Sequence, residues 1–239
     1  MRAKVFMVTV VQDQQLVAHT RWIVDRGPRP RARGWYHAGA AFLAAVSGAV
    51  LTTFSWMTLP WLFAIGVTVY AVALLQLYGV SAAYHCVPWR SARAVEWWKW
   101  ADHSTIALFI AATYTPMALM VLSAQAALWL LAAVWGGALV SVFLSLVSHP
   151  RWLDVLLYLA MGWLVLPLIP QLWANAGPTV VWLLFAGGVV YSIGALFYLL
   201  RWPGRNALWF GYHEHFHLAT VIAGVLHMIA IWMVVVQGA

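Results

Sequence analysis

The chain has 239 residues, of which 64% are hydrophobic and only 8% are charged. An ordinary soluble domain is about half apolar and about a quarter charged, so this chain has too few charged side chains to cover a water-exposed surface. The composition therefore excludes a soluble globular domain and favours the lipid bilayer as solvent. The formal charge of +7 suggests nucleic acid at first, but its distribution along the chain points elsewhere. The single cysteine, Cys86, excludes an intrachain disulfide.

Residues 1–34 are predicted to be a basic arm, cytoplasmic and partly disordered, ahead of one membrane domain over residues 35–239. The arm holds seven of the thirteen Lys and Arg residues. Its start resembles a signal peptide, but the apolar stretch is short and polar residues 12–15 follow it without a small-residue cleavage site. We therefore reject a signal peptide. Whether the arm belongs to the mature protein stays open.

Seven apolar segments follow, and a helix needs about 20 mostly apolar residues to cross the hydrocarbon core. Short connections predict that neighbouring helices run antiparallel. Most prolines fall near the proposed boundaries, whereas Pro116 and Pro167 lie inside spans and are expected to kink them. The predicted spans are residues 36–55, 61–84, 103–122, 125–147, 152–172, 178–200 and 211–236.

The basic residues predict the orientation of these spans. The connections at 56–60, 123–124 and 173–177 contain no Lys or Arg, and the alternate connections contain all those outside the arm. By the positive-inside bias, the basic side and the N-terminus are cytoplasmic, and seven spans then place the C-terminus outside. This distribution explains the positive charge without nucleic acid. Most of the seventeen tryptophans lie at predicted helix ends, where they anchor the protein in the interface.

Three polar clusters interrupt the apolar pattern at the cytoplasmic ends of spans. Ser81 and His85 end the second span, Asp102 opens the third, and His213 and His217 open the seventh. Ionisable groups in a span are costly and mark a functional site by default. The topology places all three clusters at one depth.

These clusters predict a metal site. His213 and His217 are four residues apart and project from one helix face, so both can bind one ion, and His85 supplies a third nitrogen. Three protein ligands with an open fourth position are typical of catalytic zinc. Histidines at the interface also often only hydrogen-bond to headgroups or carbonyls, so the residues alone leave both interpretations open.

Other polar residues receive weaker assignments. His103 is interpreted as a helix-end residue or as a neighbour of the site. Glu214 and His215 are expected to point away from the face shared by His213 and His217, toward the interface. His227 is interpreted as a hydrogen-bonded packing residue deeper in the seventh span.

The same residues resemble the hemolysin III proteins, which belong to the progestin and adipoQ receptor family. The resemblance runs from about residue 29 to the C-terminus. Its motifs agree in order, spacing and span assignment. They are Arg29–His37, Ser81-x-x-x-His85, Asp102-His103-Ser104 with Ala112–Pro116, and His213-x-x-x-His217.

The resemblance implies a seven-helix fold with zinc near the cytoplasmic face on His85, His213 and His217. It also implies that Ser81 and Asp102 lie close to the zinc-bound water. One departure is visible upstream of the first-span histidine: many bacterial members carry Glu and Asn where this chain has Pro30 and Arg33, which leaves the role of His37 open.

By analogy, the site predicts zinc-dependent hydrolysis of a membrane lipid amide or ester, ceramide-like, with Asp102 as general base and Ser81 as hydrogen-bond donor. One alternative is a receptor-like or membrane-homeostasis protein with structural zinc, and another is a cytolytic pore-former. Abundant arginine and alanine favour a GC-rich bacterial genome and hence a bacterial plasma membrane. The sequence does not predict the substrate or the oligomeric state.

Overall fold

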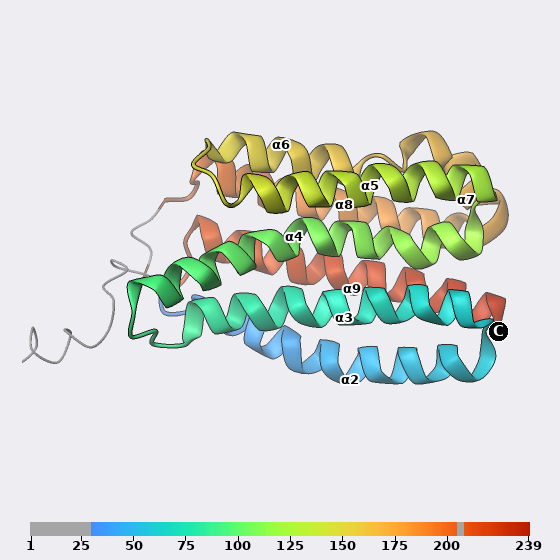
Figure 1. Cartoon of the computed structure of the whole chain (residues 1–239), viewed down its shortest axis with the longest axis horizontal. Helices are drawn as coiled ribbons and strands as arrows, with labels where there is room; N and C mark the ends of the chain where they lie inside the picture. Colours follow the sequence, from blue (N-terminus) through green and yellow to red (C-terminus); the bar gives the residue numbers. More distant parts are fainter. Residues whose placement is uncertain (1–29, 205–207) are drawn as a thin grey trace, which may run out of the picture.

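The computed structural model describes residues 30–204 and 208–239, and within these two ranges every regular element is a helix (Figure 1). The predicted basic arm falls almost wholly outside the described residues. Seven segments are long and apolar enough to cross a membrane, which confirms the predicted all-α, seven-span class. The elements are α2 (Trp35–Thr58), α3 (Trp61–Cys86), α4 (Ala92–Val121), α5 (Ala124–Leu144), α6 (Arg151–Gly162), η1 (Leu166–Leu168), α7 (Ile169–Ala176), α8 (Pro178–Leu200) and α9 (Tyr212–Gly238).

Helix α4 begins eleven residues before the predicted start of its span at residue 103. The side chain of Ser91 caps it by accepting a hydrogen bond of 3.1 Å from the Ala94 backbone N–H. The added turns carry Glu96 and Lys99, which a hydropathy criterion excludes although they are compatible with a helix. As a result, Asp102 lies inside α4 and does not open it. The helix continues through Pro116.

The fifth span consists of two helices instead of one. Helix α6 ends at Gly162, the 3₁₀ turn η1 follows at Leu166–Leu168, and α7 continues to Ala176. Pro167 and Pro170 lie in this stretch, and each lacks the N–H that an α-helix would use. The predicted disturbance at Pro167 is therefore a break of the helix in mid-span.

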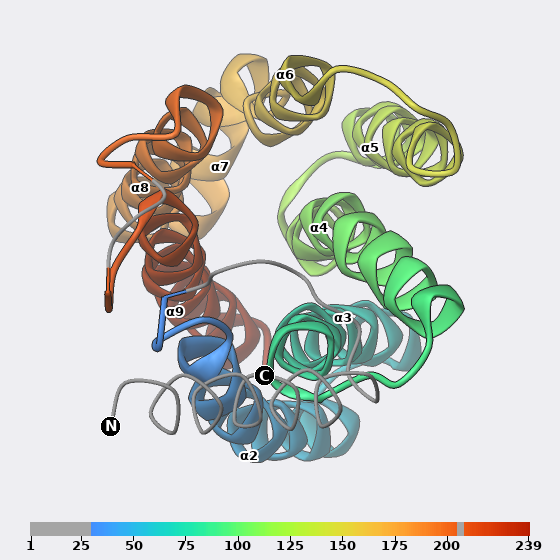
Figure 2. The ribbon, with the colours of Figure 1, turned by 90° about the vertical axis from the view of Figure 1, so that its left-hand side faces the viewer.

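The helices form a closed ring when viewed from the end at which α2 begins (Figure 2). Neighbours in sequence pack side by side from α2 to α5, α8 packs along α9, and α9 returns to α2. Helix α4 also contacts α6 and α9 across the ring. This arrangement brings α3, α4 and α9 together although they are far apart in the sequence.

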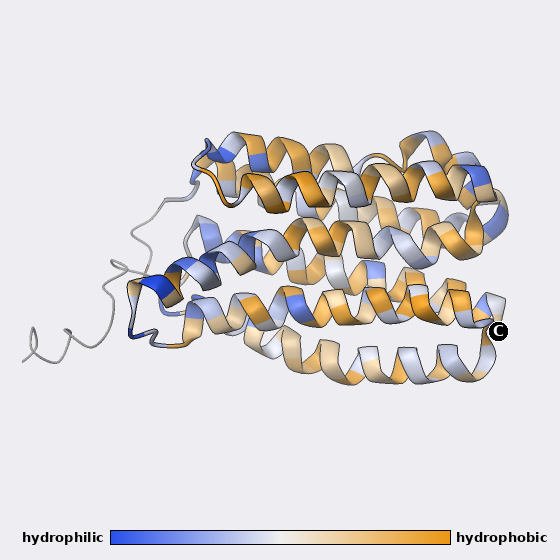
Figure 3. Cartoon of the chain, in the orientation of Figure 1, coloured by the Kyte–Doolittle hydropathy of each residue, from blue (hydrophilic) through white to orange (hydrophobic). Residues whose placement is uncertain are grey.

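The basic residues that the structure describes gather at one end of the bundle. Figure 3 shows hydrophilic residues at the N-terminal ends of α4 and α9, while most of the middle of the bundle is apolar. Arg90, Arg93 and Arg201 flank helix ends on this side. The chain enters α2 here, and α9 ends at the opposite end (Figure 1). We refer to the basic end as the cytoplasmic end, following the positive-inside prediction.

Candidate metal centre

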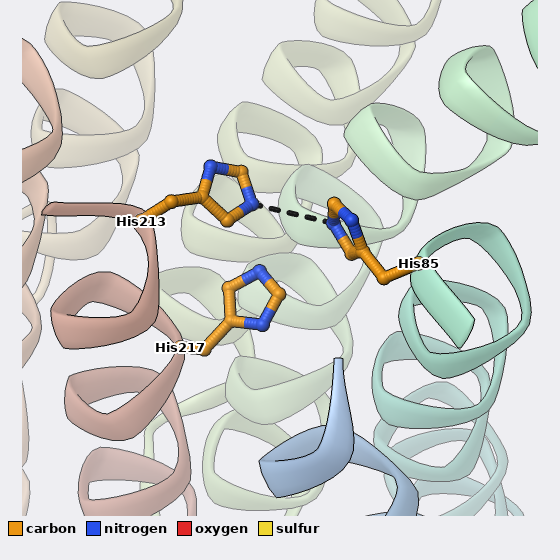
Figure 4. Close-up of side chains that lie close together, drawn as sticks. All are labelled: His85, His213 and His217. Carbon is orange, nitrogen blue, oxygen red and sulfur yellow. Dashed lines mark hydrogen bonds between the residues drawn. The ribbon is translucent and has the colours of Figure 1, made fainter. Parts of the chain in front are cut away.

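Three imidazole rings meet at the cytoplasmic end between α3 and α9. His213 and His217 lie one turn apart at the start of α9, and His85 lies in the last turn of α3 (Figure 4). One ring nitrogen from each residue lies within 4.8 Å of the other two. His85 and His217 are buried, and His213 is half-buried. The structure thus brings together the three histidines that the sequence assigns to one ion.

The geometry of these rings fits a bound metal ion. The Nε2 atoms of His85 and His213 are 3.2 Å apart. Two nitrogens bound to a tetrahedral zinc ion at about 2.0–2.1 Å would lie about 3.3 Å from each other. Without a cation, one of the two nitrogens must carry a proton, because two lone pairs facing each other repel. A set of three nitrogen ligands from two helices is therefore suited to a divalent ion.

Asp102 and Ser81 lie beside the three histidines. The Asp102 Oδ2 atom is 3.6 Å from His85 Nε2, the nitrogen that also faces His213. Ser81 lies one turn before His85 on α3, is 2% exposed, and lines the same cavity as Asp102. A carboxylate at this position balances positive charge among the imidazoles and can accept a proton from a water molecule nearby.

A fourth histidine, His37 on α2, packs against the site. Its ring stacks on that of His217, with centroids 4.0 Å apart and an angle of 4° between the ring planes. Its Nε2 atom is 3.0 Å from the Thr220 hydroxyl. The sequence left the role of His37 open, and the structure places it where it fixes the orientation of the His217 ring.

The segment before α2 crosses the cytoplasmic end of the site. Arg33 forms an ion pair with Glu214, which is only 1% exposed and also accepts a hydrogen bond of 2.9 Å from the Gly211 N–H. The prediction that Glu214 faces the interface is therefore wrong. Gly34 has a φ of +83°, and an added Cβ would lie 2.6 Å from the His85 Cβ. Only a residue without a side chain allows this close approach.

Two adjoining cavities extend from the site into the bundle. The first, which we call the polar cavity, has a volume of about 40 Å³ and is lined by Ser81, Asp102, His213 and His217 among others. The second, the apolar cavity, has a volume of about 120 Å³ and lies between α4, α6, α8 and α9. They share the lining residues Leu77, Ile106, Tyr158, Tyr191 and Thr220.

A second carboxylate lines the polar cavity from the opposite wall. Asp154, in the first turn of α6, is 9% exposed and pairs with His149, whose Nε2 atom is 2.8 Å from Asp154 Oδ1. This contact was not predictable from the sequence, because a charged residue in the first turn of a span is typical of an ordinary helix end. His103 lines the cavity too, and its Nδ1 atom is 2.8 Å from the Lys99 carbonyl oxygen.

Comparison with known proteins agrees with this architecture. The sequence profile described as "Haemolysin-III related" matches residues 27–228. Hemolysin-3 of Bacillus cereus is 34% identical over 145 residues, which cover 59% of this chain and 65% of that protein. The Hemolysin-3 homolog of Bacillus subtilis is 33% identical over a segment of the same length, covering 67% of that protein.

A human protein, monocyte to macrophage differentiation factor, is 29% identical over 177 residues, which are 69% of this chain and 68% of that protein. The profile covers most of the chain, including His37 and all five residues assigned to the site from the sequence. The chain therefore belongs to the haemolysin-III related family of multi-pass membrane proteins.

Proposed function

We propose that this protein uses zinc to hydrolyse an amide or ester bond in a membrane lipid, ceramide-like in kind. One observation carries the proposal: two of the three clustered imidazoles, His213 and His217, line a polar cavity together with the buried Asp102, and this cavity adjoins an apolar one. In a lipid, the polar linkage likewise adjoins the acyl chain, so the linkage would lie in the polar cavity and the chain in the apolar cavity.

The donor set supports zinc over the hard cations. Ca²⁺ and Mg²⁺ prefer oxygen ligands, whereas imidazole nitrogen suits zinc and its transition-metal neighbours. Three protein ligands leave one position open, as in catalytic zinc sites. Zinc in such a site lowers the pKa of a bound water to about 7 and polarises carbonyl groups.

Asp102 and Ser81 then have separate roles. The Asp102 carboxylate, 3.6 Å from His85 Nε2, accepts the proton of the attacking water as general base. It can return that proton to the leaving amine or alcohol. The Ser81 hydroxyl, buried one turn from His85, can donate a hydrogen bond to the carbonyl oxygen as negative charge develops there.

The apolar cavity supports a lipid as substrate. It is lined mostly by apolar side chains of α4, α6, α8 and α9, and the broken stretch between α6 and α7 contributes Trp163, Val165 and Leu166. An acyl chain gains little from moving between bilayer and cavity, so the cavity serves to align it. The scissile bond would then lie in the polar cavity beside Asp102.

The test compares purified wild-type protein with Asp102→Asn, both loaded with zinc and supplied with long-chain ceramide. Fatty acid release and zinc content are measured together. We expect Asp102→Asn to keep about one zinc per chain and to lose turnover by about 10²- to 10⁴-fold. Glu96→Gln, which changes an exposed carboxylate on the same helix, should behave as wild type.

Two results would contradict the proposal. No fatty acid release from ceramide or from a phospholipid by the zinc-loaded wild type would favour a structural ion that joins α3 to α9. Full turnover by Asp102→Asn would show that Asp102 is not the general base. Leakage of dye-filled liposomes on addition of the pure protein would instead favour the cytolytic alternative.

A further inference from the structure

Two polar side chains that line the apolar cavity have an atom that makes no hydrogen bond within the described residues: the Tyr191 hydroxyl and the Nδ1 atom of His227. Most other polar side chains of the lining are already satisfied: the hydroxyls of Thr113, Tyr114, Tyr158, Ser192 and Thr220 all donate to backbone carbonyls. Tyr191 lines both cavities and lies at their junction. His227 lines only the apolar cavity, away from the metal centre.

The His227 ring is held firmly against α8. A Cβ added at Gly187 would lie 2.4 Å from His227 Nε2 and 2.5 Å from Cδ2, so the Nε2–Cδ2 edge of the ring packs directly on the glycine backbone. The Nε2 atom is also 3.3 Å from the Leu184 carbonyl oxygen. The Nδ1 atom lies on the opposite side of the ring from this edge and therefore points away from the α8 contact.

The contact with Leu184 fixes the tautomer. A carbonyl oxygen only accepts hydrogen bonds, so Nε2 must carry the proton and donate. In a neutral imidazole Nδ1 is then an acceptor with one lone pair. A hydrogen-bond acceptor at membrane depth is costly when it has no donor, and such polar residues in spans mark ligand paths.

We propose that His227 Nδ1 binds a hydroxyl group on the chain of the lipid, so that the cavity prefers a chain hydroxylated near its middle. The preference is for an alcohol over a ketone, because Nδ1 needs a donor. This inference rests on the proposed function, since it places the head of the lipid at the metal centre and its chain in the apolar cavity.

The distance between the two sites selects the position of the hydroxyl. His227 is ten residues after His217 on α9, which is about 15 Å along the helix. An extended chain advances about 1.2 Å per bond, so the hydroxyl lies about a dozen bonds from the carboxyl carbon. A chain of eighteen carbons with its hydroxyl near carbon 12 fits this spacing.

The experiment measures binding without turnover. The zinc-loaded protein in detergent is incubated with equal amounts of octadecanoate, 12-hydroxyoctadecanoate and 6-hydroxyoctadecanoate, and the bound species are counted by native mass spectrometry. We expect wild-type protein to favour the 12-hydroxy acid by about 3- to 10-fold over both competitors. His227→Phe keeps a ring but removes the acceptor, so it should bind all three about equally.

A second variant controls for a folding defect. His227→Asn retains a side-chain acceptor and should recover part of the preference. Equal binding of the three acids by the wild type, or an undiminished 12-hydroxy preference in His227→Phe, would overturn the inference. The two proposals are contradicted by different results. An absence of fatty acid release would contradict the proposed hydrolysis, and the binding preference could still be measured in that case.

Discussion

The inner and outer helices of the bundle differ in what they contribute. In α3, α4 and α9, half or more of the most apolar stretch is buried within the protein, whereas in α2, α5, α8 and the α6–α7 segment less than a third is buried. All five site residues assigned from the sequence lie on the three inner helices. The outer helices carry exposed large side chains such as Leu128, Trp129 and Phe143, and α3 and α9 expose some on their outward faces as well, such as Leu75 and Val225.

This difference shows where a membrane bundle can hold polar chemistry. Half or more of the most apolar stretch of each inner helix is buried, so a polar side chain on the buried face finds protein partners instead of lipid. The outer helices mainly pack and anchor. Helix α2 and the turn before it are an exception, because Arg33 in the turn and His37 in the helix reach the inner site. Substitutions in the two groups of helices test this division of roles.

The ion pair between Arg33 and Glu214 should make the largest contribution to stability. Arg33→Met leaves the Glu214 carboxylate buried without its charge partner, which we expect to cost about 3 kcal/mol. The double variant Arg33→Met/Glu214→Met should lose clearly less than the sum of the two single variants. Thermal unfolding in detergent measures this, and additive losses would show that the two residues are independent.

Close packing of outer helix α8 on inner helix α9 should come next. A Cβ added at Gly194 would lie 2.4 Å from the Ala219 Cβ, and neither backbone can move freely there. Gly194→Ala should therefore destabilise the protein by about 2 kcal/mol. Gly79 on α3 has nothing within 4 Å of an added Cβ, so Gly79→Ala serves as the matched control. Equal unfolding temperatures for the two variants would contradict this packing.

His37 should affect metal binding more than folding. His37→Ala removes the ring that stacks on His217, and we expect zinc affinity to fall about 10-fold, as for other residues that orient ligands. Competition with a chelator measures the affinity. Ser47→Ala, on the exposed side of the same helix, should leave it unchanged. An unchanged zinc affinity in His37→Ala would show that α2 contributes packing alone and does not orient the ligands.

The smallest expected effect is a pH dependence of stability that comes from the pair of His149 and Asp154. Desolvation lowers the pKa of His149, but the hydrogen bond to Asp154 and the Val147 carbonyl outweigh it, so the pKa of His149 is raised. The pair therefore stabilises the fold fully below about pH 6.5, and this contribution is lost as the pH rises through the raised pKa. His149→Gln should lose about 0.5 kcal/mol at about pH 5.5 and nothing at about pH 9. A constant difference in melting temperature would argue against the pair.

The sequence predicted the number of spans because hydropathy and length are local properties. It placed the start of α4 wrongly, since Glu96 and Lys99 lower the hydropathy of residues that still form a helix under the Ser91 cap. It predicted a kink at Pro167, and the structure has a full break between α6 and α7 there. Helix continuity depends on hydrogen bonds that hydropathy does not measure.

The site was predictable as far as residue spacing and topology allow. His85, His213 and His217 share one depth because their spans end on one side of the membrane. The contacts of Glu214, Asp154 and His37 depend on how whole helices rotate and cross. A single sequence contains no direct signal of that rotation, so Glu214 was assigned to the wrong side of α9.

The most direct test is the zinc content of the purified protein after exposure to zinc and removal of excess. We predict about one zinc per chain in the wild type and in His103→Ala, and almost none in His85→Ala, which loses one of three ligands. A wild-type protein that binds no zinc, or a His85→Ala variant that binds as much as the wild type, would contradict a metal centre shared by α3 and α9.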